Sequence, residues 1–153
     1  DYDTYAEGEA ELGWLNSSVR VISETEFELD QLLLDIVGRL KNALAEQSAE
    51  AAHLKTIGLW EGFFGVANLV SSENAAELSL ASNCRVKAVD VIVNARVACD
   101  PKLLEKLVTE QVTAAGAAVF GKVEFRRTQS FKPGRPVPTH RVEAPISDGR
   151  PSG

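Results

Sequence analysis

The chain has 153 residues, of which 44% are hydrophobic and 25% are charged, and its formal net charge is −6. This composition is typical of a globular protein, and the length suits one domain with a sizeable hydrophobic core. No uncharged apolar run approaches the ~18 residues that a membrane-spanning helix needs. The net negative charge argues against general nucleic-acid binding.

The sequence contains no methionine, and its first residues are acidic and polar rather than a secretion signal, so we expect a fragment or a processed chain. Cys84 and Cys99 flank a strand-like run. In an extended strand their Cα atoms would lie tens of Å apart, whereas a disulfide needs about 4.4–6.8 Å. Two free thiols fit a reducing compartment, which predicts a cytoplasmic location.

Charge is unevenly distributed along the chain. Residues 1–11 contain five acidic and no basic residues, and we interpret them as an acidic linker. Residues 120–142 contain six basic residues and one acidic residue. Three prolines between Lys132 and Arg141 prevent helix and central strand alike. We therefore expect a folded domain over residues 12–131 and a basic, extended tail over residues 132–153.

Apolar and polar residues alternate over residues 14–22, which predicts a half-buried strand. One face of this strand would carry Leu15, Val19 and Val21. The other face would carry Asn16, Ser18 and Arg20. The run from Thr25 to Glu28 resembles a helix capping box, and leucines at helical spacing follow. We expect a helix over residues 26–47, in which Gly38 allows close packing on a sheet.

Further strands are predicted over residues 53–60 and 65–71 as a hairpin, over residues 78–80, and over residues 87–97, where the alternation is clearest. Asp100 and Pro101 predict a helix start, because Asp accepts free amides and Pro suits the first helical position. This helix should end at Gly116 or Gly121, before a last strand that reaches Phe131.

Two β-α-β halves joined by hairpin strands predict an α+β fold of the ferredoxin-like β-α-β-β-α-β type with an extra hairpin strand. Both helices should lie on one face of a mostly antiparallel sheet. Trp14 and Ile22, on the outer register of the first strand, suggest that the other face is partly covered.

The sequence contains neither a phosphate-binding loop nor clustered metal ligands, since His53, His140 and the two cysteines are scattered. We therefore predict no catalytic, cofactor-binding or metal residues. The helix dipole beyond Cys99 could lower the pKa of its thiol, but Asp100 opposes that shift, so a structural thiol is favoured.

The basic segment provides the candidate residues for binding an anion or an acidic partner: Arg126, Arg127, Lys132, Arg135, His140 and Arg141. A solvated C-terminal extension is an equally weighted alternative. RNA is a weaker hypothesis, because the aromatic and basic signature of an RNA-binding sheet is missing.

The stretch from Asp3 to Leu15, DTYAEGEAELGWL, resembles the junction that follows the GTPase domain of CobW-like proteins. The later stretches ARVACDP and SFKPGRPVPTHR are similar to the C-terminal domains of a bacterial branch of that P-loop GTPase family, which includes nickel-insertion GTPases. The resemblance implies an accessory domain for regulation or client recognition. No catalytic or metal residue is carried over to this chain.

By the same resemblance, GTP and a divalent metal would belong to the parent protein, and the partners would be an upstream GTPase domain and a client metalloprotein. The first alternative is a self-sufficient ferredoxin-like module that binds an anionic ligand or acidic partner through the sheet face and the basic tail. The second is an oligomeric enzyme with a shared site. A homo-oligomer is left open, and no membrane partner is expected.

Overall fold

A computed structural model describes residues 12–132, and the predicted linker and residues 133–153 of the tail lie outside the described part. The elements in chain order are β1 (Gly13–Glu28), α2 (Leu29–Glu46), β2 (Ala51–Trp60), β3 (Phe63–Leu69), β4 (Glu77–Leu80), β5 (Arg85–Val97), α3 (Pro101–Ala118) and β6 (Gly121–Phe131). No helix of residues 12–132 is both long and apolar enough to cross a membrane.

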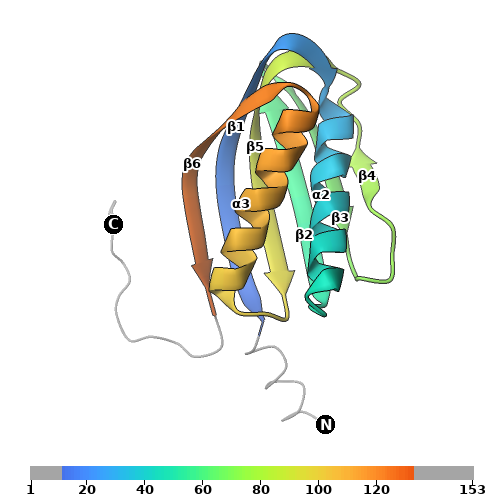
Figure 1. Cartoon of the computed structure of the whole chain (residues 1–153). Helices are drawn as coiled ribbons and strands as arrows, with labels where there is room; N and C mark the ends of the chain where they lie inside the picture. Colours follow the sequence, from blue (N-terminus) through green and yellow to red (C-terminus); the bar gives the residue numbers. More distant parts are fainter. Residues whose placement is uncertain (1–11, 133–153) are drawn as a thin grey trace, which may run out of the picture.

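The strands form one six-stranded sheet in the order β4-β3-β2-β5-β1-β6, and every neighbouring pair is antiparallel. Both helices cover the same face of this sheet (Figure 1). The units β1-α2-β2 and β5-α3-β6 interleave, because β5 lies between β1 and β2. The predicted α+β fold is therefore confirmed, and β3 and β4 extend the ferredoxin-like arrangement beyond β2.

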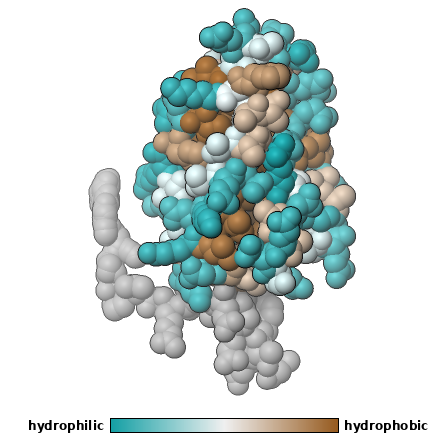
Figure 2. Space-filling model, in the orientation of Figure 1, coloured by the Kyte–Doolittle hydropathy of each residue, from teal (hydrophilic) through white to brown (hydrophobic). Residues whose placement is uncertain are grey.

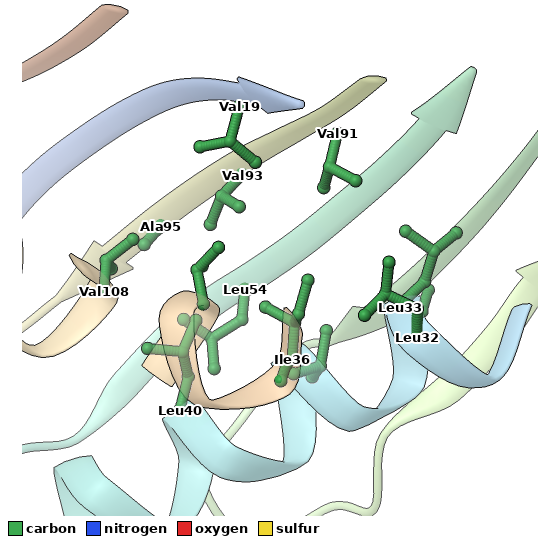
Figure 3. Packing of buried hydrophobic residues seen from close by; sticks show 14 of the residues in the cluster. Val19, Leu32, Leu33, Ile36, Leu40, Leu54, Val91, Val93, Ala95 and Val108 are labelled. Carbon is green, nitrogen blue, oxygen red and sulfur yellow. The ribbon is translucent and has the colours of Figure 1, made fainter. Parts of the chain in front are cut away.

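The core lies between the sheet and the two helices. Alternate residues of β1 and β5 point into it, as predicted for Leu15, Val19 and Val21, which are at most 1% exposed. They pack with aliphatic residues of both helices, including Leu33, Ile36, Leu40 and Val108 (Figure 3). Burial of each such side chain contributes about 1.5–3 kcal/mol, which makes this contact the main stabilising term of the fold.

The predicted helix start at residue 26 was wrong, because β1 continues to Glu28. Phe27 is only 5% exposed and lies opposite Val86 of β5. The backbone N–H of Leu29 then donates to the carbonyl of Cys84 at 3.0 Å. Burial of Phe27 against a distant strand thus outweighs the local capping signal, and Glu28 makes no side-chain cap bond.

Asp30 connects the first turn of α2 to the turn before β5. Its carboxylate accepts hydrogen bonds from the backbone N–H of Ser82 at 2.9 Å, the Ser82 hydroxyl at 2.7 Å and the backbone N–H of Asn83 at 2.8 Å. Burial by itself would raise the pKa of Asp30, but these hydrogen bonds outweigh it and the pKa is lowered. The ionised carboxylate therefore holds the β4–β5 turn on the helix.

The lowered pKa of Asp30 predicts an acid-sensitive fold. The pKa of Asp30 in the folded protein lies below its unfolded value of 3.8. The carboxylate therefore contributes fully to the free energy of unfolding above pH 3.8, and this contribution is lost as the pH falls through the folded pKa. Asp30→Asn should lower the free energy of unfolding by about 1–3 kcal/mol at pH 7. Urea titrations between pH 2 and pH 7 should show a weaker loss of stability in acid for the variant, and an equal loss in both proteins would contradict this role.

Gly38 and Gly65 differ in what surrounds them. The prediction that Gly38 allows close packing was wrong, because a Cβ built there meets nothing within 4 Å. A Cβ at Gly65 of β3 would lie 2.6 Å from Oδ1 of Asp30 and 3.3 Å from the carbonyl oxygen of Leu80. Gly65 is thus required by packing. Gly38 meets no such constraint, and it makes helix α2 less stable than alanine would.

The contrast gives a matched pair of alanine variants. Gly38→Ala should raise the free energy of unfolding by about 1 kcal/mol, the helix-propensity difference. Gly65→Ala should lower it by about 1–3 kcal/mol through overpacking against Asp30. Chemical denaturation of both variants measures the difference, and equal shifts in the same direction would refute this explanation.

Candidate anion-binding site

The sheet face opposite the helices carries a cluster of nitrogen-bearing side chains on its three neighbouring strands β1, β5 and β2. This face points away from the viewer in Figure 1 and Figure 2, where the near side is mixed, with hydrophilic and hydrophobic patches. Arg96 of β5 lies between Trp14 of β1 and His53 of β2. In the next row, Asn94 of β5 lies between Asn16 and Lys55.

These two rows surround a depression of about 430 Å³ on the open face. It is lined by Trp14, Leu15, Asn16, His53, Lys55, Asn94, Ala95 and Arg96. The lining contains two cationic side chains and, within the described residues, no carboxylate. Neither Lys55 nor Arg96 forms an ion pair with a carboxylate of residues 12–132. The depression is therefore electropositive in a chain of net negative charge.

Trp14 forms the aromatic wall of this site. The guanidinium carbon of Arg96 lies 5.2 Å from the centre of the indole ring, a cation–π contact, and the Phe131 ring packs at 5.8 Å with a tilt of 46°. The indole Nε1–H is buried and has no acceptor among the described residues. A buried donor without a partner costs about 1–3 kcal/mol. Trp14 therefore lines the depression through its ring, and its N–H is not exposed there.

The pKa of His53 is affected by burial and by the two cations of the depression. Burial lowers the pKa of this imidazole, and the charges of Arg96 and Lys55 lower it further. His53 is consequently neutral at pH 7, with one ring nitrogen that donates and one that accepts. It adds polar contacts to the lining without adding a third positive charge.

A second charged cluster on the open face is already neutralised. Arg20 donates to both carboxylate oxygens of Asp90, at 2.8 and 3.0 Å, and its guanidinium carbon lies 5.2 Å from the centre of the Trp60 ring. The hydrogen bond to Asp90 raises the pKa of Arg20, and the same bond lowers the pKa of Asp90. Because its charge is satisfied internally, we interpret this pair as structural.

The sequence-predicted candidate residues are only partly described. Arg126 forms an ion pair with Glu124 at 3.2 Å, and Arg127 lies opposite Ser18 on the edge of the sheet. Lys132 is exposed at the end of the described residues. The remaining candidates, Arg135, His140 and Arg141, lie outside the described part of the chain.

The depression itself was missed in the sequence analysis, where His53 counted only as a scattered histidine. The alternation of residues 14–22 and 87–97 places Asn16 and Asn94 on the outer faces of their strands. It does not say which strands are neighbours or in which register. Those two facts are needed before Trp14, Lys55 and Arg96 can be recognised as one site.

Metal and thiol chemistry have little support in the described residues. No group of three or more His, Cys, Asp or Glu side chains within residues 12–132 could hold a metal ion. Cys84 and Cys99 are free thiols. Burial raises the pKa of Cys99, and the charge of Asp100 raises it further, so this thiol is a poor nucleophile at neutral pH.

Comparison with known proteins adds no relative: no family model matches the chain, and neither a curated protein nor a solved structure matches it. The candidate site is therefore defined by its own geometry.

The electropositive field makes a prediction about His53. Its pKa should lie below 6.5, and Lys55→Gln or Arg96→Gln should each raise it, because each removes a charge that opposes protonation. NMR titration of the imidazole measures the shift, and Lys106→Gln, an exposed cation on α3, serves as the control. An unchanged His53 pKa in both site variants would show that the cations do not act on the depression.

Proposed function

We propose that this chain is a non-catalytic binding domain that holds an anionic group, a carboxylate or a phosphate, in the depression beside Trp14. The observation that carries the proposal is a depression lined by two cations, Lys55 and Arg96, that form no ion pair within residues 12–132. This form of the binding-module hypothesis uses the sheet face in place of the basic tail.

Each lining residue has a distinct task in this proposal. Arg96 is oriented by its contact with the Trp14 ring and can offer two parallel N–H donors to an oxyanion. Lys55 adds a compact positive charge, and the Trp14 ring adds an aromatic wall that contacts Arg96. Uncharged hydrogen-bonding groups complete the lining and can orient a bound anion without adding charge. They are the amides of Asn16 and Asn94 and the neutral imidazole of His53.

The distribution of charge restricts how such a ligand binds. The whole chain is negative and would repel anions at long range, but screening limits that effect to about 8 Å at physiological ionic strength. Within this distance the two cations of the lining dominate. Binding should therefore weaken as salt is added, because the direct attraction is screened in turn.

The test is a titration of the ¹⁵N-labelled chain with inorganic pyrophosphate and, separately, with citrate, followed by NMR. The two tryptophans, Trp14 and Trp60, give two indole N–H signals, and Trp60→Phe assigns them. We expect the Trp14 signal to shift with saturation while the Trp60 signal stays in place, because only Trp14 lines the depression. The tighter probe identifies the class of oxyanion.

Two variants and a control make the titration specific. Lys55→Gln and Arg96→Gln should each weaken binding about tenfold, the effect of losing one charged hydrogen bond, whereas Lys106→Gln should not. Equal binding by all three variants, or no Trp14 shift with either anion, would refute the proposed site. A dispersed amide spectrum for each variant shows that it is folded.

The resemblance to CobW-like proteins supports a second candidate function, which is compatible with the first: an accessory domain of a GTP-binding protein. The two free thiols support a cytoplasmic location for it. The depression lies at the end of the sheet where β1 begins, so a domain preceding the chain would enter beside it. Fusion of the natural upstream sequence should then confer GTP binding and perturb the Trp14 signal. An upstream sequence without a phosphate-binding loop would end this candidate.

A further inference from the structure

β6 is a long edge strand whose outer side has no neighbour in the described structure. It has 11 residues and pairs only with β1, whereas the opposite edge, β4, has four residues. Edge strands expose unpaired N–H and C=O groups, and proteins commonly keep such edges short or covered. The length of β6 therefore makes it a ready acceptor for another extended segment.

Three of the five exposed phenylalanines of residues 12–132 lie in or directly before this strand, and the other two, Phe63 and Phe64, begin β3. Phe120, immediately before β6, is 84% exposed, and Phe125 and Phe131 are 38% and 42% exposed. Phe120 also has a φ of 60°, a conformation that glycine adopts at lower cost than an aromatic residue. Phe120 is therefore exposed to solvent and has an unfavourable backbone conformation. Both properties suit a residue that contacts another molecule.

The register with β1 separates the side chains of β6 into two faces. Lys122 lies opposite Ile22 and Arg127 opposite Ser18, which places both cations on the open side. Val123 lies opposite Val21 and Phe125 opposite Val19, so both point to the helix-covered side. Neither Lys122 nor Arg127 forms an ion pair within residues 12–132. Glu124, opposite Arg20, lies on the same open side between them and pairs with Arg126. A segment alongside β6 would thus meet a net positive face that holds one carboxylate, and an apolar surface on the other side.

A second copy of this chain fits the edge poorly. Antiparallel pairing of Gly121–Phe131 with itself over its full length is centred on Arg126, which would lie opposite its own copy. Like charges directly opposite each other on neighbouring strands are destabilising, and the ion pair of each Arg126 with Glu124 lessens this repulsion without removing it. The shift in β1–β6 register between Ser18 and Val19 also bends the edge, which disfavours an extended symmetric contact.

We infer that β6 is a docking edge for an extended acidic segment of a partner protein, which adds to the sheet as a seventh strand. Acidic side chains of that segment face Lys122 and Arg127, and its alternate apolar side chains contact Val123 and Phe125. Backbone hydrogen bonds provide affinity, and the charges and apolar contacts provide specificity. None of these four residues lines the depression, so this inference stands apart from the proposed anion site.

The test uses as its probe a synthetic nine-residue peptide of alternating glutamate and valine, with threonine in place of the glutamate that would lie opposite Glu124. Saturable NMR shifts should follow the amides of β6 rather than those of β4, and the β6 amides should exchange more slowly with deuterated solvent. The double variant Lys122→Glu/Arg127→Glu should bind at least about tenfold more weakly, whereas Lys106→Glu should bind like the parent chain.

A second probe separates strand addition from simple charge attraction. The same peptide with alternate backbone nitrogens methylated keeps its charges but loses the hydrogen-bond donors of one edge, and it should not bind β6. Equal binding of both peptides, no binding of the first, or no effect of the double variant would overturn the inference. Dimerisation in sedimentation that Arg127→Glu abolishes would also overturn it, because the occupant would be a second copy.

Discussion

The pairing of β1 with β5 is the constraint on which the rest of the structure depends. These two strands lie at the centre of the sheet, and their register puts Val19 opposite Val91 and Arg20 opposite Asp90. A slip of β1 by one residue would turn Val19 and Val21 towards solvent and Arg20 into the core. Burial under the two helices therefore fixes the register of the open face as well.

The open face carries two clusters of charged side chains that differ in whether a carboxylate neutralises them. Arg20 and Asp90 satisfy each other, so their charges hold neighbouring strands together without attracting a ligand. Lys55 and Arg96 lie on the same sheet without a carboxylate partner in the described residues. Positive charge that no carboxylate of the described residues neutralises is the physical basis of the proposed site.

The ends of the elements depend on contacts between distant segments. Asp30 receives its hydrogen bonds from the turn before β5, and Gly65 provides the space that this carboxylate occupies. The turn between β4 and β5 is thus held to α2 by a buried ionised group. The opposite edge, β6, has no such covering strand in the described residues and keeps its cations and phenylalanines exposed.

The sequence by itself determined those features whose physical signal spans a few residues. The alternation in β1 and β5 identified their buried faces, and Asp100 was recognised as a helix cap, as its hydrogen bonds to the amides of Lys102 and Leu103 confirm. These signals are local because a strand face repeats every two residues and a cap reaches only three residues ahead.

Only the tertiary structure decided where β1 ends and where the site lies. Phe27 remains in a strand because Val86, far along the chain, covers it, and this contact outweighs the local helix signal. Trp14, Lys55 and Arg96 become neighbours only through the order and register of three strands. That arrangement depends on how two helices bury one face of the sheet, a property of the whole fold that no short stretch of sequence contains.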